Sequence, residues 1–241
     1  MTSTKLIARH DWAPGLSTLS IDAAPDFEAG QFFNLGLCDA PGLRRSYSAA
    51  SAPGRGLEFL VIEVPGGALT PGLLQLRIGD TLEVDLAPQG FFTLNYMPKT
   101  RDAWLLATGT GLGPFIAMLR DPKLWDHFQR VVLVHGVRQL TDLAYASELR
   151  ALEQHRGERF KYLSCTSRDA SAPGLLGRIP AAISDGRLAA AAGAAFDPEH
   201  SHVLLCGNPQ MIDDSQRALA ELGLRKHRVR KPGHISFEKY W

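Results

Sequence analysis

The chain has 241 residues, of which 45% are hydrophobic and 21% are charged, a composition typical of a globular protein large enough for two domains. Its formal charge of +1 lacks the strong basic excess of nucleic-acid-binding proteins, so we expect no nucleic-acid partner. No apolar run approaches ~18 residues and the first residues lack the apolar core of a signal peptide, so we expect a cytoplasmic protein outside the membrane.

Residues 1–98 are rich in short β-type runs separated by proline–glycine pairs. The predicted strands are Lys5–Arg9, Leu16–Ile21, Gln31–Leu37, Arg45–Ala49, Leu57–Val64 and Thr81–Leu86. Several short strands at near-regular spacing are typical of an antiparallel barrel or sandwich. We therefore predict that this half of the chain is an antiparallel β domain.

The stretch Arg44-Arg45-Ser46-Tyr47-Ser48 combines a guanidinium, a phenol and two hydroxyls in one predicted strand. Arg45 and Tyr47 then share one face, while Ser46 and Ser48 share the other. A guanidinium pairs bidentately with phosphate, and a phenol ring stacks on a conjugated ring system. The stretch suits a flat, anionic ligand such as a flavin nucleotide, although an ordinary strand with an exposed Arg and a half-buried Tyr has the same pattern.

One short helix is predicted between the last two of these strands. Thr70 is expected as its N-cap and Pro71 as its first helical residue. Free N–H groups at a helix start attract phosphate, so this turn is a second candidate for contact with a nucleotide.

From residue 99 to 241, apolar runs alternate with helical patterns. The apolar runs are Trp104–Ala107, Val131–Val134, Tyr162–Cys165 and Val203–Cys206, and the helical patterns are Ala144–Leu152 and Gln210–Leu222. Near-continuous apolar runs fit strands buried on both faces, and their alternation with helices predicts a parallel sheet with right-handed crossovers. The boundary between the two domains is expected near residue 98.

Two glycine-containing turns follow strands of this second half. Thr108-Gly109-Thr110-Gly111-Leu112-Gly113-Pro114 comes after the first strand, and its glycines would let the backbone approach a pyrophosphate. Its spacing is not the GxGxxG of the usual dinucleotide fingerprint. Cys206-Gly207-Asn208-Pro209 repeats the layout after the fourth strand. Because ligands of open parallel sheets lie beyond the carboxyl ends of the strands, both turns could face one cleft; a ligand-free turn and a buried structural thiol are the alternatives.

Three arginines fall at strand ends or turns of the same half: Arg138, Arg168 and Arg178, with Ser167 directly before the second. Guanidinium groups and a hydroxyl that converge at a sheet edge would suit a phosphomonoester such as the one on the adenosine ribose of NADP. Taken singly, each arginine also fits a solvated surface charge.

Cys38, Cys165 and Cys206 are far apart and cannot supply the four thiolates of an iron–sulfur cluster, and no CxxC pair suggests zinc. We expect no metal site, so a redox centre would be a bound organic cofactor.

The chain ends in Tyr240-Trp241, aromatics that we expect to be buried against the protein or a ligand ring. The basic run Lys226–Lys231 before them is either a solvated face or a dock for an acidic protein.

Together these motifs resemble the ferredoxin–NADP⁺ reductase family, in its bacterial ferredoxin/flavodoxin reductase branch. The resemblance rests on Arg45–Ser48, Gly66–Pro71, Gly109–Pro114, Cys206–Pro209 and Glu238–Trp241, and it covers nearly the whole chain. It implies an antiparallel FAD-binding β-barrel over residues 1–98, followed by an NADP-binding α/β domain over residues 99–241.

The resemblance also implies roles for individual residues. Arg45 would bind the FAD phosphate, Ser46 lies within the same motif, Tyr47 would stack on the flavin, and Ser48 would hydrogen-bond near flavin N5. Backbone groups of Leu60, Val61, Ile62 and Glu63 would meet the flavin, and Ala68, Leu69 and Thr70 the pyrophosphate. Thr110 would lie where the two cofactors meet, and Arg138, Ser167, Arg168 and Arg178 would form the 2′-phosphate pocket. Cys206 would lie near the nicotinamide and Glu238 near the flavin, and these two with Ser48 would support catalysis. Tyr240 and Trp241 would pack on the flavin or on the adenine.

The function that the resemblance implies is electron transfer through FAD between NADP(H) and a one-electron carrier, an acidic ferredoxin or flavodoxin, by a monomer. Hydride transfer between the two cofactors would require their rings to stack at about 3–3.5 Å. Two alternatives remain: a flavin reductase subunit that serves an oxygenase or another electron-transfer system, and a non-catalytic nucleotide-binding protein that kept the fold.

Overall fold

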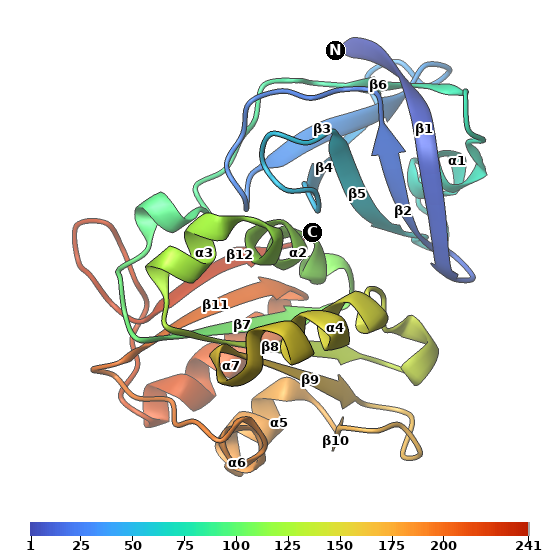
Figure 1. The fold of residues 1–241 in the computed structure, drawn as a ribbon. Helices are drawn as coiled ribbons and strands as arrows, with labels where there is room; N and C mark the ends of the chain where they lie inside the picture. The colour runs from blue at the N-terminus through green and yellow to red at the C-terminus, as the bar shows by residue number, and fades with distance from the viewer. Residues whose placement is uncertain (241) are drawn as a thin grey trace. The chain divides into compact units, whose positions relative to one another are not determined.

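The structure, a computed structural model, describes residues 1–240, which form two compact units. The first unit comprises Met1–Thr93 and Gly113–Pro122, and the second comprises Leu94–Leu112 and the chain from Lys123 onwards. Each unit has its own six-stranded sheet (Figure 1). Trp241, which the sequence predicts to be buried or packed on a ligand ring, lies outside the described residues.

The sheet of the first unit is antiparallel, as the sequence predicts. Its strands are β1 (Thr2–Ala13), β2 (Leu16–Ile21), β3 (Phe32–Leu37), β4 (Arg44–Ser48), β5 (Leu57–Ile62) and β6 (Thr81–Val84), in the order β4-β3-β6-β1-β2-β5. An antiparallel bridge between Ala49 and Phe59 joins the two edges of the sheet, which thereby closes into the expected barrel.

The β1–β2 hairpin shows how the local sequence specifies this barrel. Ala13 pairs with Leu16 across the two-residue turn Pro14-Gly15, and Gly15 has φ +73°, a conformation that a residue without Cβ adopts at no steric cost. Inside the barrel, the fully buried Phe33 and Phe59 pack edge to face with ring centroids 6.1 Å apart.

Two helices belong to the first unit. Helix α1 (Thr70–Gln75) begins one residue earlier than predicted, because Leu69 is its N-cap and Thr70 is already helical. Thr70 was therefore wrongly predicted as the cap: its Oγ1 instead accepts a hydrogen bond of 2.9 Å from the amide of Val64, across the preceding loop. Helix α2 (Gly113–Arg120) ends in Arg120, whose guanidinium donates to Glu58 at 2.7 Å and to the Ala50 carbonyl at 3.1 Å.

The sheet of the second unit is parallel and confirms the four predicted strands. They are β7 (Asp102–Thr108), β8 (Arg130–Val137), β9 (Phe160–Thr166) and β11 (Ser201–Gly207), to which β10 (Leu175–Leu176) and β12 (Ile235–Lys239) are added at the two edges. The strand order is β10-β9-β8-β7-β11-β12. The two edge strands were not predicted.

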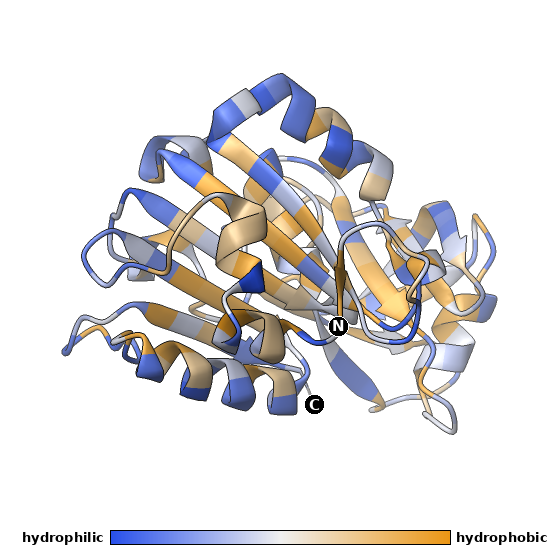
Figure 2. Ribbon diagram, turned by 90° about the horizontal axis from the view of Figure 1, so that it is seen from below, coloured by the Kyte–Doolittle hydropathy of each residue, from blue (hydrophilic) through white to orange (hydrophobic). Residues whose placement is uncertain are grey.

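Helices cover both faces of this parallel sheet. They are α3 (Pro122–His127), α4 (Ala146–Arg156), α5 (Ile179–Ser184), α6 (Arg187–Ala192) and α7 (Pro209–Glu221), with 3-10 turns η1 (Leu94–Tyr96), η2 (Gly109–Leu112), η3 (Leu140–Asp142) and η4 (Gly157–Arg159). Helices α5, α6 and α7 pack on the face that carries Trp104 and Leu106. On the opposite face, Trp125 of α3 packs edge to face against Phe160. Figure 2 shows hydrophobic residues along the strands and hydrophilic residues on the outward faces of the helices.

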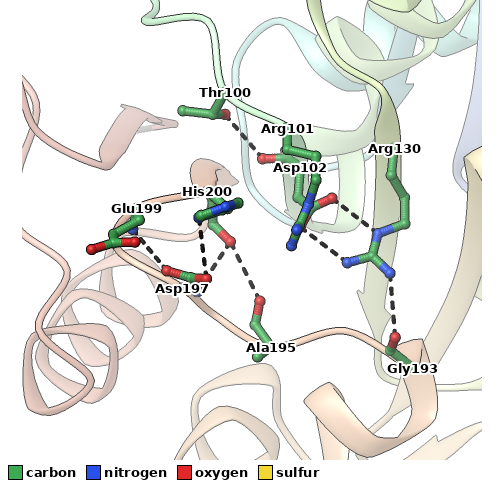
Figure 3. A network of polar contacts seen from close by, with 10 residues as sticks. Thr100, Arg101, Asp102, Arg130, Gly193, Ala195, Asp197, Glu199 and His200 are labelled. Atoms are coloured by element: carbon green, nitrogen blue, oxygen red, sulfur yellow. Dashed lines mark hydrogen bonds and ion pairs between the residues drawn. The ribbon is translucent and has the colours of Figure 1, made fainter.

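The amino ends of β7 and β8 are held by a polar network (Figure 3). Asp102 is almost fully buried, and its carboxylate accepts hydrogen bonds from Arg130 at 3.0 and 3.1 Å and from Arg101 at 2.8 and 3.2 Å. Arg130 also reaches the carbonyl of Gly193 at the end of α6. This network anchors the amino ends of these two strands, at the end of the sheet opposite to the carboxyl ends. None of the helices within residues 1–240 has the length and apolar composition that crossing a bilayer requires.

Candidate functional site

The β4 stretch presents its side chains as the strand alternation predicts. Tyr47 lies opposite Phe33, while Ser46 lies opposite Asn34 on the other face and donates a hydrogen bond of 2.9 Å to the Asn34 side chain. Arg45 is exposed and donates to the carbonyl of Arg44 at 2.7 Å. Arg45 and Tyr47 therefore share a face, with the cation at the solvent side and the ring half-buried.

The Tyr47 ring is held in place by aromatic packing. It lies edge to face against the buried Phe59, with ring centroids 6.5 Å apart. Burial raises the pKa of Tyr47 to about 12, while the Arg45 charge acts in the opposite direction. The phenol is thus neutral at physiological pH and offers a flat apolar surface with one polar tip.

The backbone of β5 lies next to Ser48 at the end of β4. Glu58 accepts a hydrogen bond through its carbonyl from the Ala50 amide at 2.8 Å, so its backbone groups point to the β4 side of β5. By the alternation of an antiparallel strand, those of Leu60 and Ile62 point the same way, and the Ala49–Phe59 bridge sets Leu60 opposite Ser48. Val61 is fully buried, Glu63 is exposed, and the Glu63 amide donates to Gly15. Donors and acceptors of the backbone on this side of β5 fit the polar rim of a planar heterocycle.

The loop before α1 is fixed by two bonds to Val64. Its carbonyl accepts from the Gly67 amide at 2.8 Å, and its amide donates to Thr70. The exposed Ala68 and the buried Leu69 follow at the helix start. The resemblance implies that this turn meets a pyrophosphate, and the two bonds restrain its backbone on both sides of Val64.

In the second unit, the two predicted glycine turns contact each other at the carboxyl ends of neighbouring strands β7 and β11. A Cβ on Gly111 would lie 2.4 Å from the carbonyl oxygen of Cys206, and one on Gly207 would lie 2.5 Å from Thr108 Oγ1. Thr108 Oγ1 also accepts a 2.9 Å hydrogen bond from the Asn208 amide. Only glycine permits this approach, so both turns form one surface, as the sequence predicts. Thr110 is buried within it.

Strand β12 brings Glu238 beside Cys206. The two residues are register partners in the parallel β11–β12 pair, and the amide of Tyr240 donates to the carbonyl of Gly207 at 3.0 Å. Burial and the nearby Glu238 charge raise the pKa of the Cys206 thiol well above its ordinary value, although a hydrogen bond with Tyr240 acts to lower it. The thiol is therefore protonated and is not a nucleophile. Tyr240 is half-buried.

The residues of the predicted arginine cluster lie at the carboxyl ends of β8 and β9 and at the start of α5. Ser167 and Arg168 donate through their amides to the carbonyls of Val137 and Arg138, at 3.1 and 2.9 Å, so the two strand extensions run side by side. The Gly177 amide donates to Thr166 at 2.8 Å, and the next residue, Arg178, is the N-cap of α5.

The arginines of this cluster have few acidic neighbours, although Arg178 lies close enough to Asp214 for its charge to help lower the pKa of that carboxyl. Arg138, Arg168 and Arg178 are exposed, and within the described chain none of them forms an ion pair with a carboxylate. Exposed guanidinium groups beside a hydroxyl have the chemistry that would suit a dianionic phosphate, so this cluster stays the candidate for such a group.

One residue at this end of the sheet was missed in the sequence. His135, on the central strand β8, is 1% exposed, and its Nε2 lies 3.1 Å from the carbonyl of Gly109. Burial lowers the pKa of His135 to about 4, against the opposing effects of that bond and of Asp142. A histidine in an apolar run gives no sequence signal that separates a structural role from a functional one.

Comparison with known proteins gives consistent matches. Residues 105–217 match the family model described as "Oxidoreductase NAD-binding domain". The chain is 40% identical to the flavodoxin/ferredoxin–NADP reductase of Shigella flexneri, over 98% of this chain and 97% of that protein. It is 33% identical to the ferredoxin–NADP reductase of Azotobacter vinelandii, over 98% and 95% of the two chains.

A solved structure is similar along the entire length. It is a ferredoxin NADP⁺ reductase from Neisseria gonorrhoeae with bound FAD and NADP, with a TM-score of 0.93 and 31% identity over 99% of this chain and 98% of that one. The antiparallel barrel, the parallel sheet and their order along the chain are thus shared with that structure.

Proposed function

The chain belongs to the flavodoxin/ferredoxin–NADP reductase family, and from this premise we propose that it transfers electrons between NADP(H) and ferredoxin or flavodoxin through bound FAD. The observation that carries the proposal is the joint presence of both nucleotide-type sites. The barrel has the aromatic–guanidinium strand and the β5 backbone beside it, and the parallel sheet has the glycine turns and the exposed arginines.

In the barrel, we assign FAD binding to the residues of β4, β5 and the α1 loop. Arg45 neutralises phosphate charge and Tyr47 presents its ring to the flavin, with Ser46 maintaining the strand through Asn34. Ser48 and the backbone of Leu60–Glu63 hydrogen-bond the flavin rim, and Ala68–Thr70 contact the pyrophosphate. When bound, FAD supplies the chemistry that couples a two-electron donor to a one-electron carrier.

In the parallel sheet, we assign NADP(H) binding to the two glycine turns and the arginine cluster. Thr110 and the glycines contact the dinucleotide backbone, and Arg138, Ser167, Arg168 and Arg178 hold the 2′-phosphate. Cys206 is fully buried and remains a neutral thiol, so we assign it a supporting role in shaping the nicotinamide site, with no covalent step. Glu238 places a carboxylate beside it, and Tyr240 covers the end of this surface.

The partner is proposed to be acidic because the basic run Lys226–Lys231 offers exposed cations around Val229, itself 70% exposed. Opposite charge steers such an encounter and makes it sensitive to ionic strength. The monomeric state, the absence of a nucleic-acid partner and the cytoplasmic location stay predictions.

The decisive experiment is steady-state turnover. The purified protein, saturated with FAD, should oxidise NADPH with the host's own ferredoxins or flavodoxins as acceptors, and the rate should fall as salt is raised. A protein that takes up no FAD, or that reduces none of these carriers, would contradict the proposal.

A sharper test concerns the arginine cluster. Replacement of Arg168 or Arg178 by Ala should weaken NADPH binding about 10–100-fold and leave NADH binding nearly unchanged, because each charge-assisted bond to phosphate contributes ~1.5–3 kcal/mol. The matched control is Arg150→Ala, an exposed arginine on α4 of the same unit. Equal losses for NADPH and NADH would show that these arginines do not read the 2′-phosphate.

A further inference from the structure

His135 occupies an unusual place for a titratable residue. It lies on the central strand β8, in register with Ala107 of β7 and Ser164 of β9, one residue before β7 ends. Apolar side chains occupy most of this strand, and His135 is nearly as inaccessible as they are. Burial of a polar ring costs free energy unless the ring makes a hydrogen bond. The group to which His135 is bonded is therefore the group that the ring restrains.

The partner is the backbone of the first glycine turn. His135 Nε2 lies 3.1 Å from the carbonyl oxygen of Gly109, which opens the 3-10 turn η2 with φ +54°. A carbonyl is only an acceptor, so Nε2 carries the hydrogen and donates it. Because burial lowers the pKa of His135 to about 4, the ring is neutral and keeps one N–H for this bond.

The remainder of the turn is fixed from the other side. Gly111 lies against the carbonyl of Cys206, at a distance that leaves no room for a Cβ. Gly109 lies two residues earlier, has no side chain of its own, and has open space around its Cβ position. The His135 bond therefore restrains the end of the turn at which the backbone is otherwise most free.

We propose that His135 is a positioning residue for pyridine-nucleotide binding, whose Nε2–H fixes the Gly109 carbonyl and so holds the Gly109–Gly111 backbone ready for the dinucleotide. This inference rests on the proposed function, since it assumes that this turn contacts NADP(H). The residue acts through the backbone that both NADPH and NADH would contact. It therefore sets affinity for the two nucleotides alike and has no part in their discrimination.

The test compares three substitutions in the FAD-loaded protein. His135→Leu removes the donor, His135→Asn keeps an amide that is too short to reach Gly109, and His135→Gln places an amide nitrogen close to the Nε2 position. Leu and Asn should weaken NADP⁺ binding, measured by isothermal titration calorimetry, about tenfold, whereas Gln should stay within about twofold of the parent protein. The KM values for NADPH and NADH should rise by the same factor, with kcat nearly unchanged, because uniform binding is lost.

The matched control is His202→Leu. His202 is equally buried in strand β11, which β7 separates from β8, and its Nε2 lies 2.9 Å from Ser236 Oγ, but it sits at the amino end of the sheet. This variant should lower the unfolding temperature as His135→Leu does, with no change in NADP⁺ affinity. Affinity losses of equal size in the two Leu variants, or a Gln variant no better than Asn, would overturn the inference.

These outcomes are separable from failure of the proposed function. If the parent protein binds no NADP⁺, the proposed function is wrong. If the parent protein binds NADP⁺ and all three His135 variants bind it equally well, only the positioning role is wrong. Should His135→Leu not fold, the comparison of Asn with Gln still decides, because both keep a polar amide and differ only in reach.

Discussion

Replacing Asp102 by Asn should destabilise the parallel-sheet unit in a way that depends on pH. The Asp102 side chain is 1% exposed, whereas Arg101 and Arg130 are 47% and 28% exposed. Removing one partner of a buried ion pair costs up to ~3–5 kcal/mol, but here the arginines can regain water. We therefore expect a loss of about 2–3 kcal/mol in the free energy of unfolding at pH 7.

The pH dependence follows from the ionisation of this carboxyl. Burial alone would raise the pKa of Asp102, but the hydrogen bonds and charges of Arg101 and Arg130 outweigh it, so the pKa lies below its ordinary value. A group whose pKa is lower in the folded state stabilises the fold above the pKa of the unfolded chain, ~3.9 for Asp. That contribution disappears as pH falls through the folded-state value, so the difference between parent and variant should shrink below pH 4.

Urea denaturation followed by far-ultraviolet circular dichroism, at several pH values between 3 and 7, measures this difference. The control is Asp185→Asn, which removes an exposed ion pair with Arg187 in the same unit and should have a much smaller effect. NADP⁺ affinity should not change in the Asp102 variant, because Asp102 lies at the amino end of β7 and the glycine turns follow the carboxyl ends of the strands. A loss at pH 3 as large as that at pH 7, or no excess over the Asp185 variant, would refute this account of the network.

Two further predictions concern packing at the candidate site. Gly111→Ala should abolish NADP⁺ binding while FAD is retained, because its Cβ would lie 2.4 Å from the Cys206 carbonyl. Gly56→Ala is the silent control, because its Cβ would lie 3.8 Å from the nearest backbone oxygens, and calorimetry with each nucleotide checks both variants. Native protein at pH 8 should release one equivalent of thionitrobenzoate from Ellman's reagent, from the exposed Cys38, since burial raises the pKa of Cys165 to about 11 and that of Cys206 well above 9. All three thiols should react in guanidinium chloride, and rapid reaction of two or more in the native protein would contradict the assigned burial.

The sequence alone determined the elements whose signals are local. Alternating apolar residues between proline–glycine turns specified the barrel strands, and the Leu16–Ile21 strand agrees residue for residue. Near-continuous apolar runs specified the four main parallel strands, because a strand buried on both faces needs no polar positions. The arginines and glycines of the candidate site were also found from sequence, since their backbone and charge properties are visible at single positions.

Tertiary structure decided what depends on partners far along the chain. Thr70 restrains the preceding loop and does not cap the helix, because its hydroxyl accepts a hydrogen bond from the Val64 amide. Strand β12 forms because Ile235–Lys239 pairs with the edge of β11 that β7 leaves open. The burial of Asp102 and His135 has the same origin: a carboxylate or an imidazole is stable inside a protein only where folding delivers donors and acceptors to it. Such polar partners are assembled by strand register, and register is a property of the whole sheet that no local run of residues encodes.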